Sequence, residues 1–327
     1  MKENCCSVCG HDHLEELLTI PDIPVFVNVL SDTPEDSQSV VRGTQQLVQC
    51  RHCGFVFNAA FEPEKVDYKE GYHAERGISP GYCRHIQSVL DLISSIEPLE
   101  KKIVLEVACG TGEFLQAVKS RGTFKCIGID PSSKEIREDG LEIHRSLFAP
   151  ACLHQNAQGI DILINRHMIE HMLRPLDMLR LFAQALPQDG MLYLETPRLD
   201  WILENQVFFD FPYEHCAYYS DDFLSRLLAA AGFSIVTIQP SYEGQYFSLC
   251  ARKCGEPCEI QTASPACLTR IRQRFSKIGQ GILRMSWNRH PAGSKDSARQ
   301  RCLSMGGSCQ GGHVCQSFAR STHRGLC

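Results

Sequence analysis

The 327-residue sequence predicts an α/β protein, with a Rossmann-like, doubly wound mixed sheet that a small β-rich domain precedes. Two observations predict this fold class. From Lys101 to Arg252, short apolar runs of strand type alternate with amphipathic helical patterns, which is typical of a doubly wound sheet. Nearer the start, the β-type runs V-F-V-N-V-L and Q-Q-L-V-Q-C flank a polar loop and are too short to build their own core.

The expected elements follow in chain order. A helix at 85–96 carries apolar residues on one face. A second helix lies between Ser220, its N-cap, and Gly232, its stop, and has an acidic first turn. The other expected elements are strands at 103–107, 126–129, 161–165, 191–195, 234–239 and 246–252, a helix that carries Phe114 inward and ends at Gly122, and a helix at 176–186.

Two matched turns near the N-terminus, C-S-V-C-G and C-R-H-C-G, predict a metal site. Their thiols, Cys6, Cys9, Cys50 and Cys53, can converge tetrahedrally on zinc, and the glycine after each pair permits a tight turn. The alternative is four unrelated reduced thiols, which the duplicated spacing disfavours. A closed site of four thiolates is structural, so we expect no chemistry from it.

These patterns divide the chain into four expected segments: a zinc-binding domain at 1–65, a connector and helix at 66–99, an α/β domain at 100–253 and an irregular tail at 254–327. The tail is rich in Ser, Arg, Gln, Gly and Cys, and its helical signal is weak. It is interpreted either as disordered or as translated in a shifted reading frame, because a one-base shift of part of it can spell a glycine loop that enters a helix.

Composition narrows the class of partner. A formal charge of −5 gives no bulk attraction to nucleic acid or membranes. No apolar run approaches the ~20 residues that span a bilayer, and the first residues lack the apolar stretch of a signal peptide. We therefore expect a cytoplasmic protein with reduced thiols that acts on a small molecule, without nucleic-acid or membrane partners.

A glycine loop, E-V-A-C-G-T-G, follows the first strand of the α/β domain. Gly110 and Gly112 let backbone N–H groups approach a ligand, but Leu115 stands where a dinucleotide fingerprint needs a third glycine. Glu106 would repel phosphate, yet it could accept from the amino group of a methionine moiety. Asp130 ends the next strand, where an acid can hold ribose hydroxyls. The alternative is a tight structural turn beside a solvated acid.

This loop resembles the first motif of the class I S-adenosylmethionine-dependent methyltransferases, with Ala108 in place of a common glycine. C-I-G-I-D is similar to their second motif, and R-H-M-I-E-H is similar to the segment after the fourth strand that faces the methyl donor. The resemblance covers roughly residues 100–253 and implies S-adenosylmethionine as cofactor. It implies these cofactor-binding residues: Glu106, Ala108, Gly110, Gly112, Asp130, Pro131 and His167.

With the zinc knuckles and F-P-Y-E-H-C-A-Y-Y-S, the chain is similar to the sugar C-methyltransferases, which act on nucleotide-linked keto-deoxysugars. In that family a zinc domain covers the active site and a second Rossmann-like domain follows the core; here that last domain is not recognisable. The resemblance implies that His215 is the base, with Glu214 as its orienting or polarising partner. It implies that His171 and Tyr72 hold the sugar or the enolate, whereas Ser146 replaces an acid on the adenine side.

The base matters because a carbon next to a ketone becomes nucleophilic only after it loses a proton, and a neutral histidine suits that task near pH 7. The non-catalytic alternatives are that His215 is a hydrogen-bonded loop histidine and that His171 and Tyr72 have structural roles. Two other functions stay open: O- or N-methylation of a small molecule, and a catalytically inactive zinc-ribbon binding protein whose α/β domain holds no cofactor.

Overall fold

The computed structural model describes residues 5–26, 33–66, 79–155 and 159–284. Tyr72 and the tail from 285 onward lie outside these ranges. Chain contacts divide the protein after Ile282, and the architecture below is that of the first unit. None of the described helices combines the length and the apolarity needed to cross a membrane.

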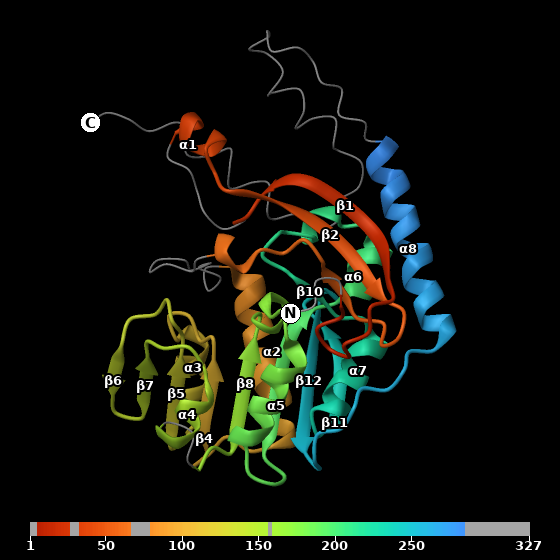
Figure 1. Ribbon diagram of the computed structural model, residues 1–327. Coiled ribbons are helices and arrows are strands. Elements are labelled where there is room, and N and C mark those ends of the chain that lie inside the picture. The colour runs from red at the N-terminus through yellow and green to blue at the C-terminus, as the bar shows by residue number, and fades with distance from the viewer. Residues whose placement is uncertain (1–4, 27–32, 67–78, 156–158, 285–327) are drawn as a thin grey trace, which may run out of the picture. The chain divides into compact units, whose positions relative to one another are not determined.

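The larger sheet confirms the predicted fold class. Its eight strands have the order β11-β12-β9-β8-β4-β5-β7-β6 (Figure 1). The central strands β4, β5, β7, β8 and β9 run parallel, whereas β12 is antiparallel to both of its neighbours and β6 is antiparallel to β7. The strand bounds are β4 Ile103–Val107, β5 Lys125–Ile129, β6 Ile136–Glu138, β7 Leu141–His144, β8 Ile162–Arg166, β9 Met191–Pro197, β11 Phe233–Ser241 and β12 Tyr246–Lys253.

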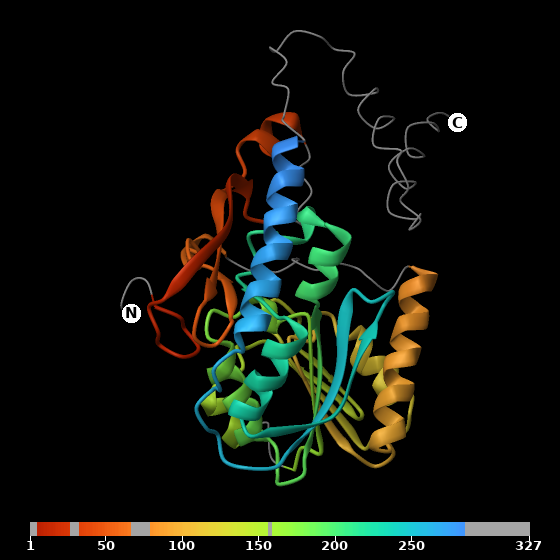
Figure 2. The same cartoon turned by 90° about the vertical axis from the view of Figure 1, so that its right-hand side faces the viewer.

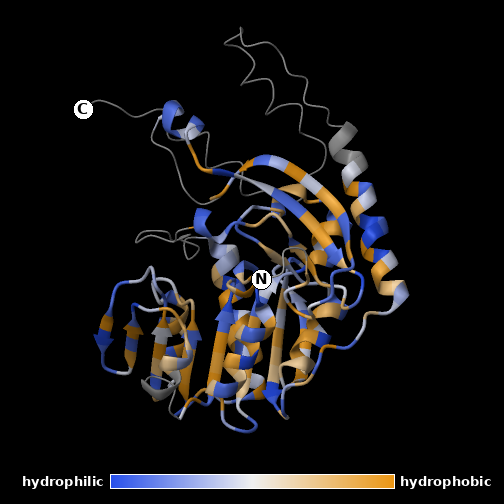
Figure 3. Ribbon diagram, in the orientation of Figure 1, coloured by the Kyte–Doolittle hydropathy of each residue, from blue (hydrophilic) through white to orange (hydrophobic). Residues whose placement is uncertain are grey.

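Helices cover both faces of this sheet, with α2 on one side and α7 on the other (Figure 2). Successive residues of β4 point to opposite faces of the sheet. Val104 packs in the hydrophobic core that includes α2 and α3, whereas Leu105 packs in the core that includes α5 and α7. The strands of the larger sheet are accordingly apolar over most of their length (Figure 3). The helix bounds are α2 Pro80–Ile96, α3 Glu113–Lys119, α4 Pro150–Gln155, α5 Pro175–Ala185 and α7 Asp221–Ala230.

Local signals explain two helix starts. Ser220 accepts a hydrogen bond of 3.3 Å from the Phe223 N–H, as predicted for the N-cap of α7. The helix α2 begins at Pro80, five residues before the predicted His85, because proline is favoured in the first turn, where its missing N–H costs nothing.

The smaller sheet joins the N-terminal segment to the α/β domain. Its order is β1-β2-β3-β10, with β1 Leu14–Pro24, β2 Arg42–Cys50, β3 Val56–Asn58 and β10 Ala217–Tyr218, all antiparallel. The strand β10 comes from the α/β domain. Phe55 also stacks on Phe223 of α7 with ring centroids 5.0 Å apart. The described residues between 5 and 65 therefore share a sheet and a core with the α/β domain.

The tail contains a helix that the sequence analysis missed. The helix α8 spans Pro265–Arg284, so the expectation of an irregular segment from 254 onward was wrong for this stretch. The helix buries Ile271, Phe275 and Ile278 at helical spacing. The helical pattern was missed in the sequence because arginines lie between the apolar positions. One of them, Arg274, forms an ion pair of 2.6 Å with the buried Asp200 of α6 (Leu199–Asn205). Short segments complete the unit: α1 Pro34–Gln38 and the 3₁₀ turns η1 Pro63–Lys65, η2 Ile169–His171 and η3 Phe208–Asp210.

Candidate active site

The glycine loop turns sharply between β4 and α3. Ala108, Gly110 and Gly112 all have positive φ, at 62°, 53° and 82°. At Gly112 the φ of 82° would strain any residue with a side chain, and a Cβ atom there would also force Cδ1 of Ile143, 2.4 Å away, to move. Ala108 adopts the left-handed conformation, which costs a residue with a Cβ atom more than it costs glycine. The loop thus keeps the predicted shape despite the alanine.

A cavity of about 840 Å³ opens at the carboxyl ends of β4, β5, β8 and β9, the edge where open α/β sheets bind ligands. Most of the predicted site residues line it: Glu106, Ala108, Gly110, Asp130, Pro131, His167, His171, Glu214 and His215. Gly112 is not among the lining residues; it lies at the start of α3, where its φ of 82° completes the turn. Tyr72 lies outside the described residues.

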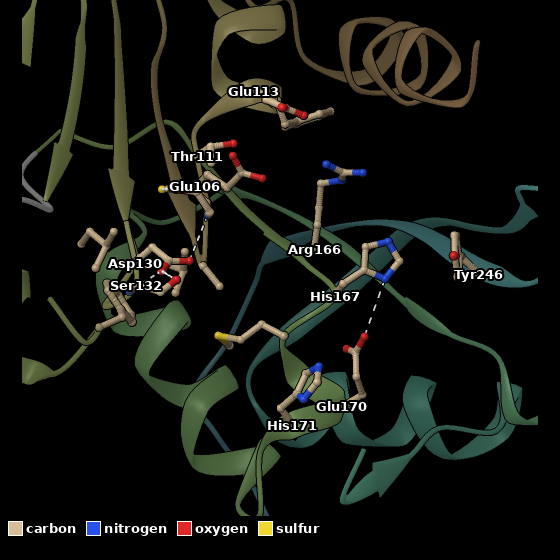
Figure 4. A pocket seen from close by; sticks show the side chains of 18 of the residues that line it. Glu106, Thr111, Glu113, Asp130, Ser132, Arg166, His167, Glu170, His171 and Tyr246 are labelled. Atoms are coloured by element: carbon tan, nitrogen blue, oxygen red, sulfur yellow. Dashed lines mark hydrogen bonds and ion pairs between the residues drawn. The ribbon is translucent and has the colours of Figure 1, made fainter. Parts of the chain in front are cut away.

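Asp130 fastens the loop to the end of β5. Its Oδ2 accepts a hydrogen bond of 2.9 Å from the Gly110 N–H, and its Oδ1 accepts from the N–H and the hydroxyl of Ser132 at 2.8 and 2.6 Å. One of the dashed lines in Figure 4 starts at Asp130 and marks this bond to the loop. Since each carboxylate oxygen has two acceptor positions, Asp130 keeps acceptor capacity toward the cavity.

Glu106 is a buried acid with an unused oxygen. Its side chain is 2% exposed, and Oε2 has no hydrogen-bond partner among the described residues. Burial raises the pKa of Glu106 to about 8, against the lowering effect of the Arg166 charge. A cationic group in the cavity would therefore find a carboxyl ready to ionise beside it.

A buried charged network forms the wall opposite Glu106, and the sequence analysis missed it. Glu195 is fully buried, and polar atoms of four side chains lie close to its carboxylate. The Arg166 Nη2 donates to Oε1 at 3.0 Å, and His167 Nε2 lies 2.7 Å from the same oxygen. Tyr193 donates to Oε2 at 3.0 Å, and His85 Nε2 lies 2.8 Å away. Burial alone would raise the pKa of Glu195, but these partners, Arg166 above all, hold it well below the usual value.

Two imidazoles and a carboxylate meet elsewhere on the cavity wall. Ligand atoms of Glu170, His171 and His215 all lie within 4.8 Å of one another. The two imidazole rings stack edge to face, with centroids 4.9 Å apart. Glu170 accepts from the Thr196 hydroxyl at 3.0 Å, and its Oε1 lies 3.6 Å from His167 Nδ1. The sequence analysis named both histidines and overlooked Glu170, although it stands next to His171.

Burial alone would raise the pKa of Glu170, but the hydrogen bond from His167 and the charges of His171 and His215 lower it to about 2. Glu170 is therefore a carboxylate throughout the neutral range. Glu214 is also buried and lines the same cavity beside His215.

The N-terminal sheet holds the loop that carries His215. The Gln45 amide of β2 donates to the carbonyls of Pro212 and His215, at 3.2 and 3.1 Å. The Glu62 N–H donates to the Tyr213 hydroxyl at 2.8 Å, and a Cβ on Gly43 would clash with the Tyr213 ring at 2.2 Å. The position of His215 therefore depends on residues far away in the sequence.

The four predicted zinc ligands lie together. The Sγ atoms of Cys6 and Cys53 are 3.6 Å apart, those of Cys9 and Cys50 are 3.5 Å apart, and all four lie within 4.8 Å of one another. The N–H groups that follow both knuckles donate back to the Cys6 and Cys50 carbonyls, as the tight CxxCG turns require. This geometry brings the duplicated knuckles to one point.

Comparison with known proteins adds independent evidence. A family model described as a methyltransferase domain matches residues 81–238. The C-methyltransferase NovU of Streptomyces niveus is 24% identical over 71% of this chain and 56% of its own length. A ubiquinone biosynthesis O-methyltransferase of Caulobacter vibrioides is 31% identical over 30% of this chain and 42% of its own. The chain thus spans about half the length of these relatives.

Solved structures include the magnesium protoporphyrin IX methyltransferase of Synechocystis with bound S-adenosylhomocysteine (SAH), at 16% identity and a TM-score of 0.42, covering 57% of this chain and 90% of that one. The family match, the strand order and the ligand edge at the glycine loop agree. Residues 81–238, which carry the glycine loop and much of the cavity wall, are therefore similar to a methyltransferase domain.

Proposed function

We propose that this chain methylates carbon next to a ketone, with a nucleotide-linked keto-sugar or a similar keto compound as its substrate. The observation that carries the proposal is the pair His171 and His215. Both histidines line the same cavity as the glycine loop, and the ionised Glu170 lies within 4.8 Å of their ring nitrogens. Similarity to NovU, named as a C-methyltransferase, supports the same reaction.

The part of the cavity beside the glycine loop has groups that suit the methyl donor. The unused oxygen of Glu106 would accept from an ammonium group, and Asp130 would accept from a ribose hydroxyl with the remaining lone pair of Oδ2. S-adenosylmethionine, when bound, supplies an electrophilic methyl group on a sulfonium centre. Since the cavity holds about 840 Å³, it has room for a second small molecule beside the nucleoside.

His215 is the proposed base. A ring nitrogen of His215 takes the proton from the carbon next to the carbonyl; the electrons of that C–H bond form a C=C bond, and the π electrons of the carbonyl move to its oxygen to give the enolate. Glu170 favours the imidazolium that forms because it remains negative. His171, edge to face with His215, would donate to the enolate oxygen. Glu214 remains the proposed orienting partner, and it lines the cavity next to the base.

The cysteine cluster fits zinc. A tetrahedral ion with Zn–S bonds of ~2.3 Å separates its sulfurs by about 3.8 Å, close to the 3.5 and 3.6 Å between the paired Sγ atoms. The ion would stabilise both knuckles and, through Cys50 at the end of β2, the strand whose Gln45 holds the His215 loop. Its proposed role is structural.

The direct test is transfer of labelled methyl from S-adenosylmethionine to a panel of nucleotide-linked keto-sugars, with substrate hydrogen–deuterium exchange measured in parallel. We expect labelled product whose new methyl is on carbon, and exchange that His215→Asn abolishes and His144→Asn, on β7, leaves intact. A product methylated on oxygen or nitrogen, with no exchange, would instead support O- or N-methylation; the name of the Caulobacter relative favours the first of these.

A further inference from the structure

Besides the four thiols, three side chains with metal-binding atoms meet on the cavity wall. One ligand atom from each of Glu170, His171 and His215 lies within 4.8 Å of the other two. All three residues line the cavity beside the glycine loop. Figure 4 shows the Glu170 carboxylate and the His171 ring next to each other at this wall. Two imidazoles and one carboxylate are a ligand set that zinc and iron accept in their divalent state.

The turn η2 holds two of these ligands in place. Glu170 and His171 both belong to η2, and the Tyr219 hydroxyl donates to the carbonyl of Ile169 in the same turn at 2.7 Å. The Thr196 hydroxyl donates to Oε2 of Glu170 at 3.0 Å. An outer hydrogen bond of this kind orients a metal-ligating carboxylate and is part of the site itself.

The third ligand comes from a separate segment with its own support. His215 lies in the loop before β10, and the Gln45 amide donates to its carbonyl at 3.1 Å. The His215 N–H donates to the Pro212 carbonyl, also at 3.1 Å, which closes a tight turn. Two independently fixed segments thus bring their ligand atoms to one point of the cavity.

The spacing suits a small dication after a modest closure of the side chains. Bonds of ~2.0–2.2 Å to nitrogen and oxygen in a tetrahedral site separate the ligand atoms by roughly 3.4 Å. The observed separations, all within 4.8 Å, are slightly wider. The carboxylate of Glu170 offsets one of the two positive charges. Because the protein supplies only three ligands, coordination positions remain that face the cavity, as in zinc sites that keep an open position.

We infer that Glu170, His171 and His215 form a second metal site, that it takes a divalent transition metal ion, and that the bound ion blocks the proposed base. A neutral imidazole has one nitrogen with a lone pair, because the other nitrogen carries a hydrogen. Once the ion takes that lone pair of His215, the ring no longer accepts a proton from the substrate. Ion binding stands apart from the proposed function, whereas the block rests on it.

Cobalt(II) tests the site without turnover, added to the full chain whose four-thiol cluster already holds zinc. We expect one equivalent of cobalt to bind and to give visible d–d absorption without the sulfur-to-cobalt charge-transfer band that thiolate ligands produce. A wild-type chain that binds no cobalt, or binds it only with the sulfur band, would overturn the site even if every variant fails to fold.

His171→Ala should weaken cobalt binding by at least about 100-fold, because loss of a ligand costs no less than the roughly 10- to 100-fold typical of outer-shell changes. Glu170→Gln should have a similar effect. The matched control is His144→Asn on β7, which removes another histidine beside a carboxylate, Glu142 at 3.6 Å. It should keep the wild-type affinity for cobalt.

A second group of possible ligands has to be separated from this one. Cys9, His11 and His52 also have ligand atoms within 4.8 Å of one another, and the two rings stack with centroids 3.7 Å apart. Cobalt that binds equally well to the wild-type chain and to His171→Ala, and is lost in His11→Asn, would lie at that group and would overturn the proposal.

Substrate hydrogen–deuterium exchange measures the block. We expect cobalt to abolish the exchange over the same concentration range in which it binds, and a chelator too weak to remove the zinc of the four-thiol cluster to restore it. Cobalt binding that leaves the exchange unchanged or speeds it would overturn the block. A chain that shows no exchange even without cobalt contradicts the proposed function and the block with it, whereas the cobalt spectrum still tests the site by itself.

Discussion

The Asp130 carboxylate accepts a hydrogen bond from the backbone N–H of Gly110 at 2.9 Å, and so ties the end of β5 to the loop after β4. One acid thus shapes the loop and lines the cavity that the loop borders. Its role differs from that of Glu106, which has no such partner among the described residues. The two acids should therefore respond differently to the same ligands.

Asp130→Ala should weaken SAH and 5′-methylthioadenosine by similar factors, roughly 10-fold or more, because both contain the ribose and both need the loop. The control is Asp139→Ala, which changes an exposed acid in the turn between β6 and β7. It should alter neither affinity. Titration calorimetry gives the affinities. A loss confined to SAH would show that Asp130 acts on the amino-acid end instead.

Donor binding should release a proton. The pKa of Glu106 is raised to about 8 by burial, so the ligand-free protein holds the acid protonated at pH 7. A cationic group beside it favours the carboxylate, so affinity should rise with pH up to about 8, by at most about tenfold per pH unit. Calorimetry in two buffers of different ionisation enthalpy measures the proton count.

The raised pKa of Glu106 also determines how this residue changes the folding stability with pH. Because the folded chain binds this proton more tightly than the unfolded chain, the contribution is complete below pH 4.5 and is lost as the pH rises through about 8. Glu106→Gln should abolish both the proton release and this slope. Buffer-independent enthalpies in the wild-type chain would refute the prediction.

Glu170→Gln should lower the methylation rate by roughly tenfold or more and move the acidic limb of its pH profile to lower pH. The reason is that the neighbouring imidazolium loses a negative charge that favours it. Thr196→Val removes only one hydrogen bond to Glu170 and is the control; it should leave the limb in place. A slower Glu170→Gln enzyme with an unshifted profile would mean that Glu170 has a packing role.

The same variant should alter acid stability. The pKa of Glu170 is lowered to about 2, so its contribution to folding is present above pH 4.5 and is lost as the pH falls through about 2. Glu170→Gln should flatten that part of the curve of unfolding free energy against pH.

Cys53→Ser should release the zinc and destabilise the first unit by at least about 3 kcal/mol, because metal-binding energy at such a site is folding energy. Cys5 precedes the first knuckle outside the four-thiol cluster, so Cys5→Ser is the matched control and should keep both the metal and the stability. Elemental analysis and thermal unfolding report the two quantities. Equal metal content in both variants would argue against the cluster as the zinc site.

Phe275→Ala should cost about 3–5 kcal/mol of unfolding free energy, because the side chain is 1% exposed and its removal leaves a cavity. Its ring lies 5.5 Å from that of Phe211, shortly before Glu214, so catalysis should suffer as well. Lys277→Ala, on the exposed face of α8, is the control. Urea unfolding measures the difference; a cost below about 1 kcal/mol would show that α8 is only loosely packed.

The parts of the fold that local signals encode could be predicted from the sequence. The apolar run of β4 was expected at 103–107 and is found at Ile103–Val107, because a strand buried on both faces leaves an uninterrupted apolar pattern. The helix α7 was expected from Ser220 and Gly232, since cap and stop residues act within one turn. The helix α8 was missed because arginines lie between its apolar positions.

The candidate site could be predicted only where a motif marks it. The loop residues and the two histidines were named from short strings, but the network around Glu195 was not. Arg166 and Glu195 stand opposite each other in the parallel pairing of β8 with β9, 29 positions apart, and only the strand register brings them together. The support of the His215 loop by Gln45 likewise crosses 170 positions. Such contacts leave no local pattern.

A crystal structure of the zinc-loaded chain with bound SAH is the most direct measurement of the central claim. We predict the nucleoside in the cavity beside the glycine loop, its ribose at Asp130, its amino-acid end at Glu106, and its sulfur turned toward His215. A cavity that stays empty at saturating ligand, or a nucleoside bound elsewhere on the chain, would contradict it.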